Sequence, residues 1–369
     1  MKKKKVLFIT NWYPNSSSLN LGVFIKRHAE SINLIAELTT AAITISSSNK
    51  IFEKQVHQSK NESVGHLIHI EIKSKLWKLI TYIPYYQYRL IKKELKKIDH
   101  FEFDLVQSNV LFAAGLIGAR FSRKLNISHV HVEHWSGISD FLKKSIYKRQ
   151  GYNALKKASA IVCVSDFFKN DISQTIPNDN IHVIPNVISD DFQVSVKKES
   201  NNIRFLAVAH WSFPKKPSLF LNALSALAKT GLTFELTLIG SGELQEQIIE
   251  EDFPFKILFL GDIKNKDLVS YYQEAEVFLH ASSYETFSVV PIESLLTGTP
   301  VVASKVGVLP EIINEDNGVL CNDTLEDWIS GIQKVVNTKY DVEKVRKSVE
   351  GKFSMETVSN KFNELYQSL

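Results

Sequence analysis

The stretch SSYETFSVVPIESLLTGTPVVAS, residues 282–304, joins a polar loop to a helical pattern and then to a short apolar run. Seven residues separate its two acids, Glu285 and Glu293. A helix over residues 287–296 would place these acids roughly 10 Å apart, given the rise of an α-helix per residue. The stretch therefore predicts a loop, a helix and a buried strand in succession, which is typical of an α/β domain.

The start of this predicted helix is a candidate anion site. Its first backbone N–H groups, near Phe287, Ser288 and Val289, have no partner inside the helix and attract a phosphate. The spacing of Glu285 and Glu293 suits a sugar at one end and a ribose at the other, with a diphosphate between them. The alternative is an amphipathic helix with one exposed and one buried acid, and the spacing alone leaves both open.

Size and composition narrow the class of protein. A chain of 369 residues favours two domains. The net charge of +4 is too small to indicate a nucleic-acid partner. Cys163 and Cys321 lack metal-ligand spacing, which favours reduced thiols in a cytoplasmic protein. We expect neither a signal peptide after Lys2–Lys5 nor a transmembrane helix, because the apolar runs are too short.

Short apolar runs alternate with helical patterns along both halves of the chain. Strands are predicted at residues 6–10, 38–45, 67–72, 105–108, 129–133, 160–164 and 182–184, and again at 204–209, 234–239, 257–260, 277–280 and 300–304. Helices are predicted at residues 22–34, 110–125, 141–158 and 166–175, and again at 216–230, 288–297, 324–337 and 341–367. Apolar strands separated by helices indicate parallel sheets covered on both faces. The predicted fold class is therefore α/β, with two doubly wound Rossmann-like domains.

The polar stretch after Val187 marks the domain boundary. It lacks strong periodicity, and we assign residues 191–202 to a linker. The first domain is then expected over residues 1–190 and the second over residues 203–352. Loops that follow strands should gather at the carboxyl edge of each sheet, where doubly wound domains bind ligands.

The Glu-x7-Glu pattern resembles the signature of the retaining family-4 glycosyltransferases, which have the GT-B fold and are also called group 1. The likeness extends over nearly the whole chain in the same order. It implies two domains facing across a cleft, with a C-terminal helix, residues 353–369, packing back on the first. It also implies metal-independent transfer from a nucleotide-diphosphate sugar, such as a UDP- or GDP-sugar, without a cofactor. The turn departs from the usual Glu-Gly-Phe-Gly, because it reads Glu285-Thr286-Phe287-Ser288.

The resemblance assigns the donor side to the second domain. It places Glu285 at the donor sugar and Glu293 at the ribose. In the loop after strand 204–209, His210 stands where the family has an Arg, and Lys215 stands at the Lys that binds the diphosphate; Lys216 is the alternate. The other donor-binding residues that it implies are Gly22, Gly240, Ser282, Phe287, Ser288 and Val289.

The first domain is expected to supply the acceptor side. The family often has a His near the reacting sugar, and the resemblance gives that catalytic role to His134, with His131 as the alternate. Asn11, Asn109 and Asn186 are further acceptor-side candidates. A zinc site of His129, His131, Glu133 and His134 stays open as an alternative, although no distant Cys or His partner accompanies it.

A basic and aromatic stretch, residues 73–97, has no acid except Glu94 and is divided by Pro84. Its composition suits peripheral contact with an anionic membrane on the cytoplasmic side, and hence a lipid-linked acceptor. The alternative is a partly exposed helix pair that uses its aromatic residues as core.

We therefore expect a retaining hexosyltransferase that moves a sugar to a saccharide or lipid-linked saccharide, in lipopolysaccharide or capsule biosynthesis at the inner face of the cell membrane. Two alternatives remain. A sugar-nucleotide 2-epimerase would convert the donor without an acceptor. A non-catalytic saccharide-binding relative is motivated by the changes at residues 210, 286 and 288, and would not turn over a nucleotide sugar.

Overall fold

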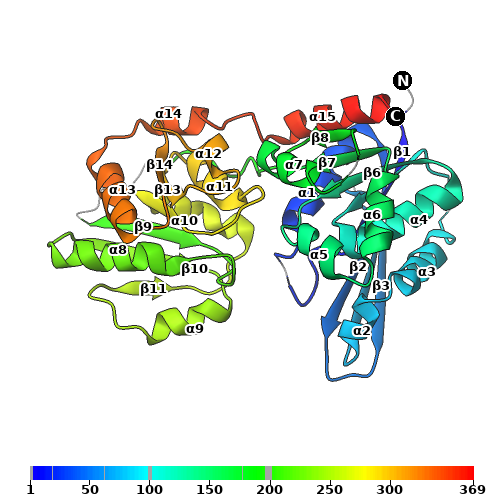
Figure 1. Cartoon of the computed structure of the whole chain (residues 1–369), viewed down its shortest axis with the longest axis horizontal. Helices are drawn as coiled ribbons and strands as arrows, with labels where there is room; N and C mark the ends of the chain where they lie inside the picture. Colours follow the sequence, from blue (N-terminus) through cyan, green and yellow to red (C-terminus); the bar gives the residue numbers. More distant parts are fainter. Residues whose placement is uncertain (1–2, 19, 62, 99–101, 177, 196–201) are drawn as a thin grey trace. The chain divides into compact units, whose positions relative to one another are not determined.

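The computed structural model describes residues 3–18, 20–61, 63–98, 102–176, 178–195 and 202–369 (Figure 1). The chain forms two compact units, Met1–Val187 with Met355–Leu369, and Ile188–Ser354. We call them unit 1 and unit 2. The linker predicted over residues 191–202 lies in part outside the described residues.

Unit 1 is built on one sheet with the strand order β3-β4-β2-β1-β5-β6-β7-β8. Its neighbouring strands run parallel, except for β3 against β4. The strands are β1 Lys5–Thr10, β2 Glu37–Ser47, β3 Glu53–Asn61, β4 Gly65–Ser74, β5 Leu105–Asn109, β6 Ser128–Glu133, β7 Ala160–Cys163 and β8 Ile181–Val183. In β1, Val6 and Phe8 pack into one apolar cluster and Leu7 and Ile9 into another, so both faces of the sheet are covered.

The helices of unit 1 supply those two covers. They are α1 Val23–Ile35, α2 Trp77–Thr81, α3 Pro84–Leu95, α4 Leu116–Leu125, α5 Ile138–Lys144, α6 Lys148–Lys156, α7 Asp166–Ser173 and α15 Met355–Gln367. α15 packs on α1, and Val358 and Phe362 are buried there. Within the described ranges, no helix is long and apolar enough to cross a bilayer.

Unit 2 repeats the plan with the strand order β11-β10-β9-β12-β13-β14, all parallel. Its strands are β9 Ile203–Val208, β10 Phe234–Ile239, β11 Ile257–Phe259, β12 Val277–His280, β13 Val301–Ser304 and β14 Gly318–Cys321. Its helices are α8 Pro217–Lys229, α9 Glu243–Glu250, α10 Val269–Glu274, α11 Val289–Leu296, α12 Leu309–Ile312, α13 Leu325–Asn337 and α14 Val342–Lys347. The prediction of two doubly wound domains is confirmed.

Several predicted helices are shorter or broken. The pattern over 110–125 resolves into a π-type turn, Leu111–Gly115, followed by α4. The patterns over 141–158 and 341–367 each give two helices. The helix predicted over 287–296 begins at Val289, because Ser288 has a left-handed backbone that no helix continues through.

Each sheet has one point where the chain reverses its direction across the strands. In unit 1 this switch point lies between β1 and β5, and in unit 2 between β9 and β12. Loops that follow such strands diverge and leave room for a ligand. The predicted site residues of unit 2 that follow β9 and β12 therefore come together at one edge.

Candidate active site

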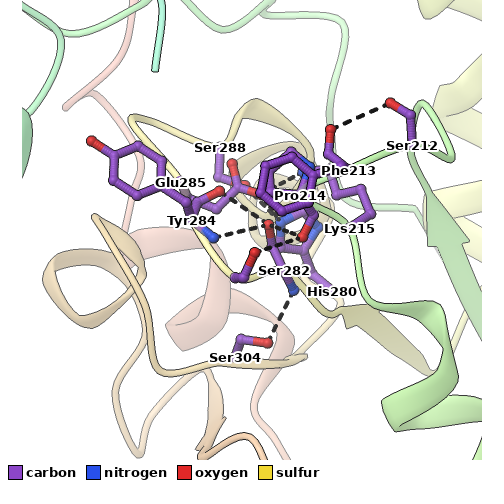
Figure 2. A network of polar contacts seen from close by, with 11 residues as sticks. Ser212, Phe213, Pro214, Lys215, His280, Ser282, Tyr284, Glu285, Ser288 and Ser304 are labelled. Carbon is purple, nitrogen blue, oxygen red and sulfur yellow. Dashed lines mark hydrogen bonds and ion pairs between the residues drawn. The ribbon is translucent and has the colours of Figure 1, made fainter. Parts of the chain in front are cut away.

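Two loops meet at the switch point of unit 2 (Figure 2). The loop after β9 donates from Lys216 N to Ala281 O over 3.1 Å, and the loop after β12 donates from Ser283 N to Pro214 O over 2.9 Å. Ser282 is buried between them, and its Oγ donates to Tyr284 O at 3.0 Å. These contacts fix the two loops against each other.

A charged cluster lies where the loops join. The ammonium of Lys215 pairs with Glu285 Oε1, and His280 Nε2 lies 2.9 Å from the same oxygen. Ser288 Oγ lies 3.0 Å from His280 Nε2. Figure 2 shows these four side chains converging from β12 and its loop on one side and the Lys215 loop on the other. The cluster is nearly closed to solvent, since both Glu285 and His280 are buried.

The electrostatics of the cluster keep Glu285 ionised. Burial on its own would raise the pKa of the Glu285 carboxyl, but Lys215 and His280 together hold it well below its usual range. Burial lowers the pKa of His280, and the Lys215 charge lowers it further. At neutral pH the cluster is therefore a carboxylate and an ammonium with a neutral imidazole beside them.

The N-terminus of α11 follows this cluster directly. Ser288 precedes the helix with φ 63°, and Val289 is its first residue. The first backbone N–H groups of a helix lack intrahelical partners. Pro291, in this first turn, has no N–H to contribute. Phe287 is buried with its ring 5.4 Å from that of Phe353, which fixes the backbone just before the helix. A helix terminus beside an ammonium group can bind a phosphate or a diphosphate.

Glu293 lies in α11, four residues after Val289, and is fully buried. Asn265 Nδ2 donates to its Oε1 over 2.8 Å, and Tyr272 Oη donates to its Oε2 over 3.0 Å. The carboxylate exposes no surface in this structure, so the ribose-binding role of Glu293 stays a prediction.

The remaining donor-side candidates lie in separate places. His210 is exposed, and Lys216 pairs with Asp323. Gly240 adopts φ 115°, and a Cβ there would lie 1.8 Å from Ala209 O. Gly22 belongs to unit 1, precedes α1 with φ 65°, and a Cβ there would lie 2.3 Å from Trp12 O. Both glycines are required by close backbone contacts, whatever they bind.

In unit 1 the structure brings His134, Asn109 and Asn186 together. His134 is buried, with its Nε2 3.5 Å from Asn109 Oδ1 and its ring 5.3 Å from that of His28. Burial, and then the neighbouring His28 and His131, hold the pKa of His134 well below its usual value, while a hydrogen bond with Asn186 opposes them. His134 is therefore neutral at physiological pH.

Asn11 does not join this group. Its Nδ2 donates instead to Ile43 O over 3.1 Å and to Gln87 Oε1 over 2.8 Å.

A series of buried polar side chains, linked by hydrogen bonds, leads to the backbone of His134. Ser108 Oγ lies 2.8 Å from His129 Nε2 and 3.0 Å from His131 Nδ1, and His131 Nε2 lies 3.1 Å from Glu133 Oε2. Glu133 also accepts the backbone N–H groups of Leu111, His134 and Trp135, over 3.0, 2.9 and 2.9 Å. His131 is thus part of this series. Among the described residues, no group of three or more His, Cys, Asp or Glu is placed to hold a metal ion.

The sequence did not single out His280 or assign a role to Glu133. His280 ends the apolar run Val-Phe-Leu-His and looks like the end of a core strand. The sequence suggests Glu133 only as a zinc ligand, whereas in the structure it contacts His131 Nε2 and accepts backbone N–H groups, one of them from Leu111, 22 residues away. No local sequence signal reveals the contact of His280 with Glu285 or that of Glu133 with Leu111.

Two family models match the chain. The model described as glycosyl transferases group 1 matches residues 188–351, and the model described as Glycosyltransferase Family 4 matches residues 53–192. Together they extend over both units.

Curated relatives agree with these matches. The "Uncharacterized 41.2 kDa protein in cps region" of Klebsiella pneumoniae is 25% identical over 74% of this chain and 81% of its own length. The alpha-monoglucosyldiacylglycerol synthase of Streptococcus pneumoniae is 24% identical over 62% of this chain and 58% of its own.

Solved structures show the same fold. A sucrose-phosphate synthase from Thermosynechococcus elongatus superposes with a TM-score of 0.78 at 18% identity, over 99% of each chain. HepE of Anabaena, in complex with UDP-glucose, superposes with a TM-score of 0.72 at 16% identity, over 99% of this chain and all of its own. These structures are GT-B glycosyltransferases, which confirms the predicted fold class.

Proposed function

The chain belongs to the group 1 glycosyltransferases, and from that premise we propose that it transfers a sugar, with retention, from a nucleotide-diphosphate sugar to a saccharide or lipid-linked saccharide. The observation that carries this proposal is the cluster of Lys215, Glu285 and the α11 terminus at the switch point of unit 2. It combines an anion-binding end with a carboxylate that stays ionised.

Each part of the cluster has a role in the proposed reaction. Lys215 and the N–H groups at the start of α11 stabilise the negative charge on the departing diphosphate. The Glu285 carboxylate orients a hydroxyl of the donor sugar and favours positive charge at its reacting carbon. Because Lys215 supplies a cation beside the leaving group, we propose that transfer needs no metal ion. On the other unit, we propose that His134 contacts the reacting sugar and that Asn109 and Asn186 lie on the acceptor side.

The proposed setting is cell-surface polysaccharide biosynthesis at the inner face of the membrane. It is supported by the name of the Klebsiella relative, which places that protein in a cps region, and by the lipid product in the name of the streptococcal relative. The complex of HepE with UDP-glucose supports a UDP-sugar as the first donor to test.

A thermal-shift screen against UDP, GDP, ADP and their sugar conjugates tests the donor site. One nucleotide should raise the melting temperature, since binding to the folded state stabilises it. Lys215→Ala should remove most of that shift, and Glu293→Gln should reduce it if the ribose lies there. The exposed Lys361→Ala, in unit 1, is the control. If no nucleotide shifts the wild-type protein, the non-catalytic alternative replaces this proposal.

NMR of the transfer reaction tests the chemistry. The product should keep the anomeric configuration of the donor, and excess EDTA should leave the rate unchanged. Inversion or loss of rate would contradict retention or metal independence respectively. Conversion of the donor sugar without any acceptor would indicate the epimerase instead.

A further inference from the structure

Three separate segments of unit 1 expose apolar side chains beside one another. They are the turn between β2 and β3, the residues around α2, and the connection from α5 to α6. Ile51 is 76% exposed, Leu79 58% and Ile146 86%. We name the whole set the apolar rim; it comprises Ile51, Phe52, Leu76, Leu79, Tyr82, Ile83 and Ile146.

Hydrogen bonds and ring contacts hold these segments together. Lys75 N donates to Lys50 O over 2.8 Å, which ties the start of α2 to the β2–β3 turn. On the other side, Tyr147 Oη donates to Tyr82 O over 2.5 Å. The Phe112 ring lies 5.4 Å from Tyr82 and 5.5 Å from Tyr147. Figure 1 shows α2 at the end of the sheet where the turn between β2 and β3 lies. The rim is therefore one surface and not three isolated patches.

The charge around the rim is predominantly positive. Residues 74–83 and 143–152 contain no Asp or Glu. The exposed bases beside the apolar side chains are Lys50, Lys75, Lys78, Lys143, Lys144, Lys148 and Arg149. Lys50 pairs with Glu53 and Lys144 with Asp140, but both acids lie outside these two stretches. Exposed apolar side chains surrounded by bases are complementary to the surface of an anionic bilayer: the apolar groups can contact acyl chains, and the bases can contact the headgroups.

The exposed apolar surface includes only part of the basic stretch 73–97, because much of α3 is buried. Tyr88, Ile91 and Leu95 of α3 are buried in the core of unit 1. The Arg120 guanidinium lies over the Tyr85 ring, 4.5 Å from its centroid, in a cation–π contact. The apolar face of α3 is thus used for folding, while α2 and the two neighbouring loops stay uncovered in the described residues.

We propose that the apolar rim and its bases dock the protein on an anionic bilayer, with Ile146 and Leu79 at the level of the headgroups. The proposal deepens the proposed function, on which it rests for the idea that the acceptor is lipid-linked. The docking itself needs no substrate, so it can be tested apart from catalysis.

Vesicle flotation of the full chain provides the test. The wild-type protein should float with vesicles of phosphatidylglycerol and phosphatidylcholine, but not with phosphatidylcholine alone. Lys148→Gln with Arg149→Gln should weaken binding about 25-fold, since each base near an anionic surface contributes roughly fivefold. Ile146→Ser should weaken it severalfold. The controls are Lys156→Gln with Lys157→Gln, at the other end of α6, and Ile249→Ser, a 57% exposed isoleucine in unit 2.

The outcomes separate clearly. Failure of the wild-type protein to bind either vesicle, or equal binding by the rim variants, overturns the proposal. Equal flotation with both vesicle types also overturns it, and so does a self-association that Ile146→Ser abolishes, since a second copy would then cover the rim. Nucleotide thermal shifts on the same variants distinguish the two proposals. Lost flotation with an intact shift supports docking, whereas flotation without any nucleotide shift leaves docking standing and removes the proposed donor site.

Discussion

At the scale of single residues, the pair of Lys215 and Glu285 decides the chemistry that unit 2 can support. The two charges lie in a nearly closed cluster, where each makes the other tolerable. A buried charge that loses its partner becomes costly, so the pair stabilises the fold of unit 2, and in the proposed function it also binds the donor. Its effects on stability and on turnover can be measured separately.

Glu285→Ala and Lys215→Ala should each lower the transfer rate about 10²- to 10³-fold, because each removes one group that stabilises the charge of the transition state. Each should also lower the free energy of unfolding by about 3 kcal/mol, by leaving the other charge uncompensated. The double variant should lose less stability than the two single losses added together. Steady-state kinetics and urea unfolding measure both effects. Unchanged turnover in either single variant would take that residue out of the site.

His280 should act as a positioning residue through its contact with Glu285. His280→Leu should lower kcat about 10²-fold while the nucleotide dissociation constant stays the same, because misplacing a catalytic group costs rate before it costs binding. His280→Gln retains a donor and should restore part of kcat. If both variants weaken nucleotide binding and stability equally, the role of His280 is only structural.

Sequence patterns could suggest that Lys215 and Glu285 belong to one site, because each follows a predicted strand of the second domain. The structure places them in contact. The patterns could not reveal His280, since a His at the end of an apolar strand has the appearance of core. Nor could they show that Glu293 would be fully enclosed by Asn265 and Tyr272, since that depends on how α11 packs.

At the scale of elements, the residue before α11 is Ser288, where the pattern Glu-Gly-Phe-Gly has its second glycine. Ser288 holds φ 63°, which costs a non-glycine residue about 1–2 kcal/mol, and its Oγ contacts His280.

Ser288→Ala should therefore destabilise unit 2 by about 1 kcal/mol, the usual worth of one hydrogen bond. Ser288→Gly loses the same bond but relieves the steric strain of the left-handed backbone, so its stability should lie near that of the wild type. Chemical unfolding of the two variants measures the difference. Equal stabilities would mean that the left-handed turn carries no strain.

Elements that depend on distant partners were the ones the sequence mispredicted. β3 was not predicted, because EKQVHQSKN lacks an apolar alternation and the strand is an exposed edge held by backbone pairing with β4. The helix over 110–125 breaks where Glu133, 22 residues away, takes the N–H of Leu111. Most of the parallel strands were predicted correctly, because their apolar character is local, but β14 was missed because only Val319, Leu320 and Cys321 mark it in the sequence.

The packing of α1 on α15 should make unit 1 sensitive to acid. His28 of α1 is buried against the Phe362 ring and the Pro185 carbonyl, and burial lowers its pKa to about 4 against the opposing effect of that carbonyl. The folded state thus prefers the neutral ring. This stability is present above the unfolded pKa of about 6.5 and is lost as pH falls towards 4, by about 3 kcal/mol.

Thermal unfolding between pH 7 and pH 4 measures this loss. His28→Gln keeps a donor for Pro185 O but cannot titrate, so its melting temperature should fall less steeply. His129, whose pKa burial lowers to about 3, should account for part of the slope that remains. An unchanged slope in His28→Gln would exclude His28 as the acid-sensitive group.

At the scale of the whole molecule, the two units have separate cores. Phe362 of α15 is fully buried in unit 1, and Phe220 of α8 is buried in unit 2. Phe362→Ala should cost unit 1 about 3–5 kcal/mol, and Phe220→Ala should cost unit 2 a similar amount. Calorimetry with a nucleotide present assigns each transition, because the donor site is proposed in unit 2 and a ligand bound there raises the transition of that unit. If both variants lower both transitions equally, the units unfold as one.

The return of α15 to unit 1 has a consequence for how the protein is made. A ribosome completes β1 and α1 before unit 2, but Val358, Phe362 and Tyr366, which cover α1, follow the whole of unit 2 in the chain. At about 5–20 residues per second, the intervening residues 188–354 take roughly 10–30 s to synthesise. Unit 2 is continuous, with its ends joined by a hydrogen bond from Ile188 N to Phe353 O. The nascent chain should therefore complete unit 2 before unit 1, while α1 stays uncovered until α15 has been synthesised.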